Sequence, residues 1–335
     1  MDRVRKDIQL IVAKGELFAP LAGKTVMVTG ATGLIGSMIV KTICVANDIY
    51  NFNIKVLGSI RNREKAEKML GELDIVLVEG YDHKCDYIIH TVSPTTSKFF
   101  IEYPVETIQS SVGSAMEVLE IARIYGARMV YLSSMEQYGV PYKNSQIMTE
   151  DKVGVIDHLN IRSSYPESKR LCECLCASYA AEYGVDVKIA RLAQTIGAGA
   201  PLTDNRMAMQ FAKAVVEGRD IVLRTTGTSV SNYVYLSDAI TGILTILEKG
   251  KSGEAYNICN DKESRNVRGI AELVCKDVAD GKIGVCIELK ENMGYAPDVE
   301  MYLDSNKLRE LGWCAEVDMV DGYRRIVEYI KYFED

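Results

Sequence analysis

The residues Thr25-Val-Met-Val-Thr-Gly30-Ala-Thr-Gly33-Leu-Ile-Gly36 carry the strongest indication of the fold in this chain. A short strand runs straight into a glycine-spaced turn, and a helix over 37–45 follows it. Gly30 permits the tight turn, Gly33 lets backbone N–H groups approach a pyrophosphate, and Gly36 allows close packing of the helix on the sheet. Because the N-terminus of a helix also favours an anion, the stretch predicts a dinucleotide-binding loop. The other cofactor contacts that we expect in it are Thr32, Leu34 and Ile35.

Short β-rich runs alternate with longer helical stretches beyond this loop. The predicted strands cover residues 26–29, 54–60, 75–78, 87–91, 129–133 and 187–191. This alternation is typical of an α/β protein and predicts a Rossmann-type, doubly wound parallel sheet with a smaller C-terminal α/β substrate lobe. The expected parts are an N-terminal helical extension over 1–23, the dinucleotide-binding Rossmann domain over 24–195 and the substrate lobe over 196–335, of which about 228–256 return to the Rossmann domain.

The composition restricts the class of protein. The 335 residues are 47% hydrophobic and 25% charged, which is the balance of an ordinary globular protein and excludes a disordered or collagen-like chain. Acidic side chains outnumber basic ones by 46 to 39, so the net charge of -7 argues against nucleic acid or an anionic membrane as the partner. No apolar run reaches the roughly 18 residues of a membrane span.

The cysteines argue against a secreted protein. Nine are scattered without a paired framework, and the first seven residues carry charged side chains where a secretory signal would be apolar, so we expect a cytoplasmic location. Cys172, Cys174 and Cys176 suggest a metal cluster, but on a helix the middle side chain points away from the other two, and no histidine accompanies them. We therefore expect no metal site.

Tyr165 and Lys169 stand four residues apart, which places both side chains on one face of a helix. An ammonium there lowers the pKa of a phenol from about 10 toward the working range, so that the tyrosine can act as an acid or a base. Pro166 is tolerated only in a first helical turn, so the helix should begin at this pair. The Tyr165–Lys169 spacing alone favours an ordinary surface helix without a catalytic role. Other motifs are needed to distinguish a catalytic pair from such a helix.

Two further polar residues are expected to be structural. His90 lies in an apolar strand, where a hydrogen-bonded core histidine is commoner than a catalytic one. Asp238 lies at a strand-to-helix turn and suits an N-cap. Neither residue is assigned to the catalytic group.

Four further motifs follow the glycine triplet in a fixed order. They are Asp86-Tyr-Ile-Ile-His90, Tyr131-Leu-Ser-Ser134-Met-Glu136-Gln-Tyr138-Gly139, Tyr165-Pro-Glu-Ser-Lys169 and Asp304-Ser-Asn-Lys-Leu-Arg-Glu-Leu-Gly-Trp313. With them the chain resembles, from near Lys24 to its end, the extended short-chain dehydrogenase/reductase superfamily, and specifically its NAD-dependent epimerase/dehydratase family of nucleotide-sugar enzymes. Members of that branch are epimerases, 4,6-dehydratases and decarboxylases.

The resemblance implies a role for each residue of the catalytic motifs. By it, Ser134 hydrogen-bonds the reacting hydroxyl or carbonyl, Tyr165 moves its proton, and Lys169 also holds the nicotinamide ribose, so that Tyr165 and Lys169 contact the cofactor too. The family's dehydratases carry Asp-Glu and its decarboxylases Ser-Glu where this chain has Met135-Glu136, whereas simple 4-epimerases lack the acid. Glu136 is therefore expected to remove a proton next to a ketone; a solvated loop glutamate is the alternative.

The chain departs from the family where the substrate diphosphate is usually held. Family members often show Arg-Asp before a Tyr/Phe-Val-Tyr strand, where this chain has Ser231-Asn232, and Arg-Pro-x-Asp later, where it has Tyr295-Ala296-Pro297-Asp298. Arg162 and two other arginines could take the place of the missing ones. The substrate-binding residues that we expect are Ser93, Gln194, Arg206 and Arg224.

The cofactor is expected to be NAD or NADP. NAD enzymes of this fold place an acid at the end of the second strand for the ribose 2′-hydroxyl. The predicted strand over 54–60 ends without one, and Arg61, Arg63 and Lys65 could accept a 2′-phosphate instead. Basic residues after a strand are also commonly just solvated. The missing acid and the three basic residues therefore favour NADP over NAD only slightly.

Together these features predict a cytoplasmic NAD(P)-dependent epimerase/dehydratase-type enzyme that transiently oxidises a nucleotide-linked sugar on its bound cofactor. The alternatives are an NADP-dependent carbonyl reductase and a dinucleotide sensor without catalysis. A small-molecule substrate of this kind leaves no role for nucleic acid or a membrane, and the oligomeric state stays open, a homodimer included.

Overall fold

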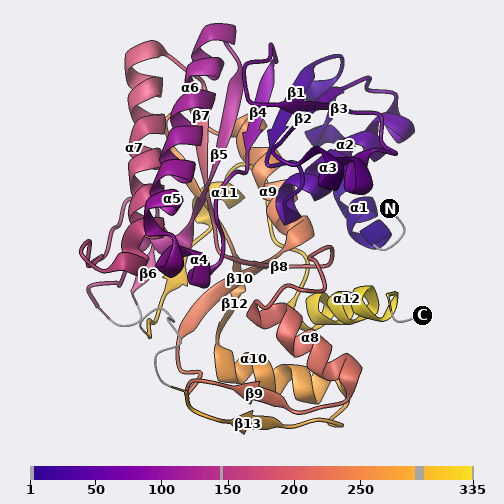
Figure 1. Ribbon diagram of the computed structural model, residues 1–335, viewed down its shortest axis with the longest axis vertical. Helices are drawn as coiled ribbons and strands as arrows, with labels where there is room; N and C mark the ends of the chain where they lie inside the picture. The colour runs from indigo at the N-terminus through magenta and orange to yellow at the C-terminus, as the bar shows by residue number, and fades with distance from the viewer. Residues whose placement is uncertain (1–3, 144–145, 291–297, 334–335) are drawn as a thin grey trace.

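A seven-stranded sheet organises the larger lobe of the computed structural model, which describes residues 4–143, 146–290 and 298–333 (Figure 1). Its strands are parallel and follow the order β11-β7-β5-β4-β1-β2-β3. Their bounds are β1 (Thr25–Thr29), β2 (Lys55–Ile60), β3 (Val76–Glu79), β4 (Tyr87–His90), β5 (Arg128–Ser134), β7 (Val187–Leu192) and β11 (Ala255–Ile258). Because helices cover both faces of this parallel sheet, the predicted Rossmann-type α/β fold is confirmed.

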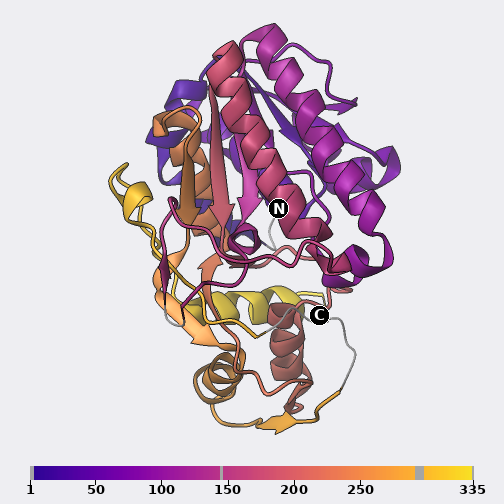
Figure 2. The same ribbon diagram turned by 90° about the vertical axis from the view of Figure 1, so that its left-hand side faces the viewer.

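Alternating apolar side chains along the strands explain why both faces are covered. In β1, Val26 and Val28 belong to one apolar cluster and Met27 to another, because successive side chains of a strand point to opposite faces. The first cluster includes helices α1, α2 and α9, and the second includes α6 and α7, which lie side by side in Figure 2. Their bounds are α1 (Arg5–Val12), α2 (Leu34–Tyr50), α6 (Ser114–Tyr125), α7 (Ser164–Tyr183) and α9 (Leu236–Lys249).

The glycine-rich turn lies at the point where the order of the strands reverses. β1 is flanked by β4 on one side and β2 on the other. Open α/β sheets bind ligands outside the carboxyl ends of the strands at such a reversal, and we call this region the crevice. Gly30 has a φ of +66°, which favours glycine. A Cβ on Gly36 would lie only 2.4 Å from the carbonyl oxygen of Gly30, so the glycine permits the close approach of α2 to the turn.

A smaller lobe lies below the carboxyl ends of the sheet (Figure 1). It contains a three-stranded sheet of order β12-β10-β8 and the parallel pair β13 and β9. Its elements are β8 (Gln194–Ile196), α8 (Met207–Glu217), β9 (Ile221–Leu223), β10 (Val230–Tyr235), β12 (Asn260–Asn266), α10 (Val267–Leu273), β13 (Val285–Ile287) and α12 (Met319–Lys331). The chain passes back to the larger lobe through α9 and β11.

The remaining elements are short connections between these layers. They are η2 (Gly15–Leu17), η3 (Ala19–Leu21), α3 (Arg63–Leu70), α4 (Ser97–Glu102), α5 (Pro104–Ile108), η4 (Gln109–Gly113), η5 (Met135–Tyr138), β6 (Ile147–Met148), η6 (Ile161–Ser163), η7 (Val274–Val278), β14 (Tyr302–Leu303) and α11 (Asn306–Arg309). The segment from α4 to α5 covers the lower end of α7 (Figure 1).

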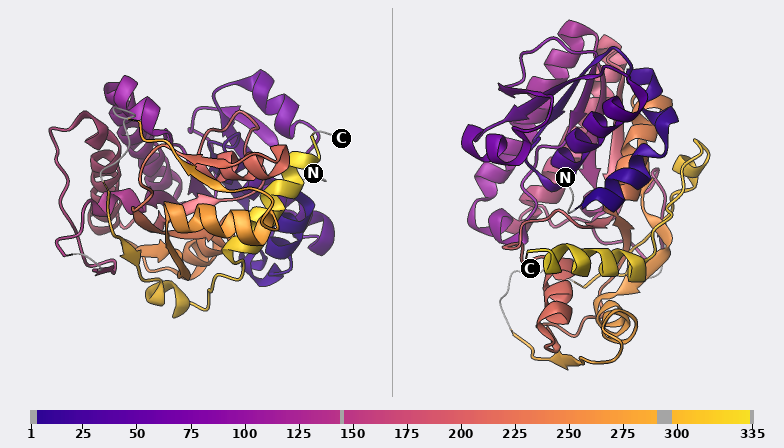
Figure 3. Two further views of the ribbon diagram at one scale, coloured as in Figure 1. Left: turned by 90° about the horizontal axis from the view of Figure 1, so that it is seen from below. Right: turned by 90° about the vertical axis from the view of Figure 1, so that its right-hand side faces the viewer.

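The N-terminal helix ties the two lobes together. α1 packs on α2 and α9, and α12 approaches it from the smaller lobe (Figure 3). The buried Asp7 carboxylate accepts a hydrogen bond from the Tyr235 hydroxyl at 2.8 Å and pairs with Arg325 of α12 at 2.9 Å. The position of the smaller lobe relative to the sheet therefore depends partly on the N-terminal extension.

Asp238 does not act as an N-cap, contrary to expectation. α9 begins two residues earlier, at Leu236, with Tyr235 in the N-cap position. The buried Asp238 carboxylate instead accepts hydrogen bonds from the backbone N–H groups of Glu316, at 3.0 Å, and Val317, at 2.9 Å. It thus fixes the segment that leads into α12.

Candidate active site

The carboxyl end of β5 presents Ser134 in the crevice. β5 ends at this residue, which is also the N-cap of the short helix η5. Its Oγ accepts a hydrogen bond from the backbone N–H of Glu136 at 3.2 Å. The strand end therefore brings a hydroxyl and a carboxylate to the edge of the sheet where open α/β proteins bind their ligands.

α7 carries Tyr165 and Lys169 on the neighbouring side of the crevice. Tyr165 is the second residue of the helix, and Pro166 lies in the first turn, where proline is tolerated. The ring of Phe100 stacks on the Tyr165 ring, with centroids 4.3 Å apart and planes 6° apart. Sequence reasoning missed Phe100; the only signal was the Phe99-Phe100 pair on a short helix after the β4 loop.

Lys169 is buried directly behind the tyrosine. Its Nζ donates a hydrogen bond to the Leu132 carbonyl at 2.7 Å and lies 5.7 Å from the centroid of the Tyr165 ring. Burial lowers the pKa of Lys169 to about 8, which the negative charge of Glu173 partly opposes. The ammonium form still predominates at neutral pH and can hold a ribose hydroxyl or stabilise an ionised phenol.

The surroundings of Tyr165 act on its pKa in both directions. Burial raises the pKa of Tyr165 above its usual value most strongly, and the Glu136 carboxylate raises it further, so the expected lowering by the Lys169 ammonium is wrong for this structure. A hydrogen bond with Ser134 and the charge of Arg162 lower it. The structure thus brings Ser134, Tyr165, Lys169 and Glu136 into one group, in which the phenol carries its proton until a ligand or a charge changes the balance.

Glu136 forms an ion pair with Arg162. An Oε atom of Glu136 lies 2.9 Å from a terminal guanidinium nitrogen of Arg162, and the two side chains are 26% and 15% exposed. The second terminal nitrogen donates a hydrogen bond to the Ser97 hydroxyl at 3.4 Å. Glu136 is therefore ion-paired and only partly exposed, not freely solvated, and its catalytic role stays a prediction.

His90 is a hydrogen-bonded core residue. Its Nδ1 lies 2.8 Å from the Thr29 hydroxyl, and its Nε2 lies 3.4 Å from the Ser114 hydroxyl. Burial and the charge of Lys169 lower the pKa of His90 to about 3, so the ring is neutral. It links the ends of β1 and β4 below the glycine-rich turn.

The start of α2 is suited to a dinucleotide pyrophosphate. Gly33 is the N-cap and supplies no capping side chain, and the first N–H groups of the helix, those of Leu34 and Ile35 included, have no acceptor within it. Thr91, which follows β4, stabilises the start of the turn because its hydroxyl donates a hydrogen bond to the carbonyl of Thr29 at 2.7 Å. Free N–H groups at the positive end of a helix are the donors that an anionic phosphate requires.

The basic residues after β2 are held differently from one another. Arg63 pairs with Glu79 at the end of β3, and Asn62 caps α3 by accepting a hydrogen bond from the backbone N–H of Lys65. Arg61 is exposed and forms no ion pair with any carboxylate in the described part of the chain. The charge of Arg63 is therefore already paired, whereas neither Arg61 nor the Lys65 ammonium forms an ion pair within the described part of the chain.

Two predicted substrate residues lie near the crevice. Ser93 follows β4, and its buried hydroxyl has no hydrogen-bond partner among the residues that the structure describes. Gln194 is exposed at the start of β8. Asn232, where the family often has Asp, is buried and accepts a hydrogen bond from the backbone N–H of Leu303 at 2.6 Å, so it connects β10 to β14.

The other two predicted substrate residues are bound by carboxylates of the smaller lobe. Arg206 precedes α8 and pairs with Asp204 at 2.6 Å. Arg224 follows β9 and pairs with Glu288. Neither contacts the catalytic group in the described chain. The motif at 295–298 lies outside the described residues except for Asp298, which accepts a hydrogen bond from the Thr228 hydroxyl.

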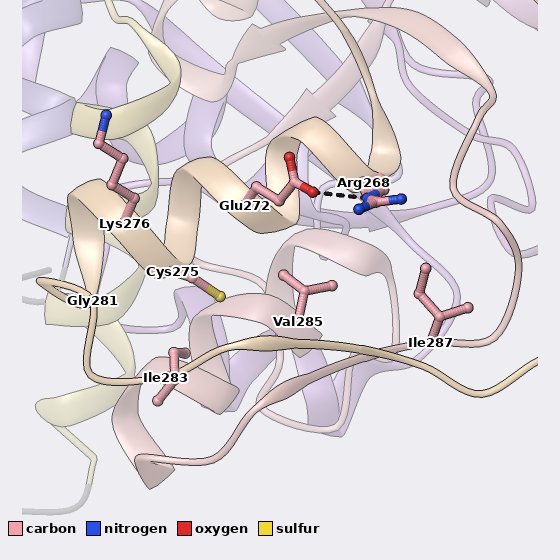
Figure 4. A pocket seen from close by; sticks show the side chains of 8 residues that line it. All are labelled: Arg268, Glu272, Cys275, Lys276, Gly281, Ile283, Val285 and Ile287. Carbon is pink, nitrogen blue, oxygen red and sulfur yellow. Dashed lines mark hydrogen bonds and ion pairs between the residues drawn. The ribbon is translucent and has the colours of Figure 1, made fainter.

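A separate pocket of about 430 Å³ lies in the smaller lobe (Figure 4). Arg268 and Glu272, which form an ion pair on α10, lie on one side of it, and Ile283, Val285 and Ile287 line the other. None of the predicted site residues contributes to this pocket. It therefore belongs to the surface of the smaller lobe and not to the catalytic group.

Two kinds of feature are missing from the described ranges. No three His, Cys, Asp or Glu side chains gather there in a way that could ligate a metal; Cys172 and Cys176 are buried, whereas Cys174 is exposed. Within the same ranges, no helix has both the length and the apolar character that crossing a bilayer requires.

Comparison of sequences identifies relatives of one family. The sequence profile of the family described as NAD dependent epimerase/dehydratase family matches residues 26–259. UDP-glucuronic acid decarboxylase 6 of Arabidopsis thaliana is 29% identical over 305 residues, which cover 89% of this chain and 86% of the relative. UDP-glucuronic acid decarboxylase 1 of Xenopus tropicalis is 25% identical over 316 residues, which cover 92% of this chain and 72% of the relative.

Solved structures share the fold at lower identity. UDP-glucose 4-epimerase of Thermotoga maritima, solved with UDP-glucose, has a TM-score of 0.76 at 19% identity, with 93% of this chain and 100% of that one covered. A dTDP-glucose 4,6-dehydratase of Streptomyces venezuelae, solved with NAD bound, has a TM-score of 0.75 at 22% identity, with 92% and 97% covered. These likenesses concern the fold of the two lobes.

Proposed function

Because the chain belongs to the NAD dependent epimerase/dehydratase family, we propose that this enzyme oxidises a nucleotide-linked sugar and re-reduces it on one bound nicotinamide dinucleotide. The observation that carries the proposal is the grouping of Ser134, Tyr165 and Lys169 beside the glycine-rich turn. The nicotinamide, when bound, supplies the acceptor and the donor of hydride. Ser134 hydrogen-bonds the reacting sugar oxygen, Tyr165 accepts and returns its proton, and Lys169 holds the ribose and stabilises the phenolate.

Glu136 acts as a base at the carbon next to the transient ketone. Oxidation of a sugar hydroxyl acidifies the hydrogen on the adjacent carbon, and the carboxylate of Glu136 lies at the strand end that presents Ser134. Met135, which stands beside it, cannot supply a proton to a leaving hydroxyl, and this favours epimerisation or decarboxylation over loss of water. In epimerisation the enolate forms when Glu136 removes the proton, and in decarboxylation it forms when the carboxylate leaves as CO2. In both reactions the enolate then takes a proton that exchanges with solvent.

A panel of nucleotide sugars tests this function. UDP-glucuronic acid comes first because the curated relatives are named for its decarboxylation, and UDP-glucose and dTDP-glucose follow from the names of the similar structures. In deuterated water, product analysed by NMR should carry one deuterium next to the oxidised carbon, and Glu136→Gln should lose both incorporation and turnover. Glu182→Gln, which removes a charge from the far end of α7, is the matched control.

The same panel separates the alternatives. Stoichiometric consumption of the reduced cofactor would identify a carbonyl reductase, and binding without turnover of any sugar would identify a dinucleotide sensor. Product free of deuterium from a fully active Glu136→Gln variant would leave Ser134, Tyr165 and Lys169 as the whole catalytic group.

The proposed cofactor preference is for NADP over NAD. Arg61 follows β2 without an ion pair to any described carboxylate, so its charge is available to a 2′-phosphate, although a similar dehydratase structure contains NAD. Calorimetric titration should show tighter binding of NADP, and Arg61→Ala should narrow the difference. Tighter binding of NAD to the unmodified protein would contradict the preference.

The outer face of α6 and α7 is proposed to join two copies of the chain. The two helices pack side by side (Figure 2). Both expose large apolar side chains. These include Met116 and Ile124 of α6 and Leu171 and Tyr183 of α7. Light scattering should give a dimer for the wild type and a monomer for Leu171→Glu, whereas Ile49→Glu, on α2, should remain dimeric. A monomeric wild type would refute this assembly.

A cytoplasmic location is proposed from the thiols. All nine cysteines are free, as in proteins of reducing compartments. Fractionation of cells that express the tagged protein tests the proposal, and recovery outside the cytoplasmic fraction would contradict it.

A further inference from the structure

Arg162 connects Glu136 to the aromatic stack at Tyr165. Besides the 2.9 Å ion pair with Glu136, its guanidinium carbon lies 5.9 Å from the centroid of the Phe100 ring, which stacks on Tyr165. We propose that Arg162 is a positioning residue that acts through Glu136: it holds the carboxylate at the sugar end of the site and balances its negative charge beside Tyr165. This inference rests on the proposed function, in which Glu136 and Tyr165 serve successive steps.

The contacts of η6 and α4 hold Arg162 in position. The arginine lies on η6, whose N-cap Asn160 accepts a hydrogen bond from the Arg162 backbone N–H at 3.0 Å, so the backbone is fixed before the side chain extends. The Ser97 hydroxyl and the ring of Phe100, both from α4, then contact the guanidinium. Because the side chains of Arg162 and Glu136 are largely buried, water screens their attraction less than at an exposed pair.

The balance of charge matters because the ionised Glu136 carboxylate opposes ionisation of the neighbouring Tyr165 phenol. A carboxylate beside a phenol opposes its ionisation, and Glu136 raises the pKa of Tyr165. Arg162 lowers the pKa of Tyr165, so it offsets Glu136 without removing the carboxylate that the sugar requires. The other titratable groups facing the tyrosine are Lys169 of α7 and Tyr131 of β5, and α4 contributes the uncharged Phe100.

The alternative role for Arg162 is to bind the substrate diphosphate. Its Nε is buried and has no partner among the described residues, so one donor remains for a ligand oxygen. A diphosphate contact predicts a raised KM that does not depend on Glu136. A positioning role predicts an effect on the oxidation step that disappears when the carboxylate is removed. The two roles therefore differ in a double-mutant comparison.

The test follows the oxidation half-reaction alone. Protein loaded with whichever of NADP and NAD it binds more tightly is mixed rapidly with a saturating concentration of UDP-glucuronic acid, or of whichever sugar in the panel the wild type converts. Formation of reduced nicotinamide is recorded. Arg162→Met should slow this step about tenfold near neutral pH and shift its pH dependence upward, because Glu136 is then unopposed beside Tyr165. Arg162→Lys should keep most of the wild-type rate.

Adding Glu136→Gln gives the decisive comparison. The double variant Arg162→Met with Glu136→Gln should recover the oxidation rate that the single Arg162→Met variant loses, although, like Glu136→Gln, it should not complete turnover. Arg219→Met, which removes an exposed arginine paired with Glu217, should match the wild type.

Four outcomes would overturn the inference. A double variant that remains as slow as Arg162→Met, or a raised KM with an unchanged pH dependence, would assign Arg162 to substrate binding. A wild-type rate for Arg162→Met would show that the pair has no role in oxidation. Absence of reduced nicotinamide with every sugar in the wild type would instead refute the proposed function, and the positioning role with it.

Discussion

Replacing Lys169 with methionine tests the electrostatics of the site most sharply. Burial lowers the pKa of Lys169 from 10.5 to about 8. At about 1.4 kcal/mol per pH unit, the charged lysine destabilises the folded protein by roughly 3 kcal/mol below about pH 8. Lys169→Met removes this penalty but also the hydrogen bond to the Leu132 carbonyl, whose loss costs about 1 to 3 kcal/mol. The variant should therefore fold with nearly wild-type stability while losing turnover.

The pH dependence separates these two effects. Because the unfolded chain binds the lysine proton more tightly than the folded chain, the stability of the wild type relative to the variant rises between about pH 8 and about pH 10.5. Between about pH 7 and about pH 10, the difference in free energy of unfolding should change by about 2 to 3 kcal/mol in favour of the wild type. Urea unfolding at both pH values measures it, with the exposed Lys262→Met as control. A difference that is independent of pH would refute the reasoning from burial.

Two further replacements test the loop and the packing of the lobes. Gly36→Ala places a Cβ 2.4 Å from the Gly30 carbonyl oxygen, so the carbonyl must move away by about 1 Å. Calorimetry should show that the affinity for NAD falls at least about tenfold. The control Gly113→Ala, whose added Cβ meets open space, should bind NAD normally. Unchanged affinity of Gly36→Ala would count against the assigned loop. Asp238→Ala leaves two backbone N–H groups without an acceptor, so it should lower the free energy of unfolding by about 2 to 4 kcal/mol. Asp238→Asn should lower it less, because its amide oxygen can still accept a hydrogen bond. Equal effects of the two variants in urea unfolding would contradict this.

The parts of the structure that the sequence predicts are those whose signals lie within one short window. The run from β1 through Gly30 to α2 combines a strand, a turn and a helix in adjacent residues. Alternation within β1 likewise assigns Val26 and Met27 to opposite faces of the sheet. The predicted role of the glycines follows from backbone geometry alone, and the structure gives Gly30 the expected positive φ.

What the sequence could not predict depends on partners far away in the chain. β12 has the polar sequence Asn-Asp-Lys-Glu-Ser-Arg-Asn, without apolar alternation, and becomes a strand because it pairs with β10. Asp238 looks like a cap locally, yet its partners lie at 316 and 317. The pairing of Glu136 with Arg162 depends on how η6 enters α7, which no local pattern specifies.

In the proposed function, Tyr165 moves a proton during a self-contained cycle of oxidation and reduction. The most direct measurement compares wild type and Tyr165→Phe, each loaded with the dinucleotide, for product formation and nicotinamide absorbance with the nucleotide sugars of the panel. We expect the wild type to convert a sugar with no net change in absorbance, and Tyr165→Phe to bind the dinucleotide normally while turning over roughly 10²-fold more slowly or worse. Wild-type turnover by Tyr165→Phe, or consumption of one dinucleotide per product, would contradict the account.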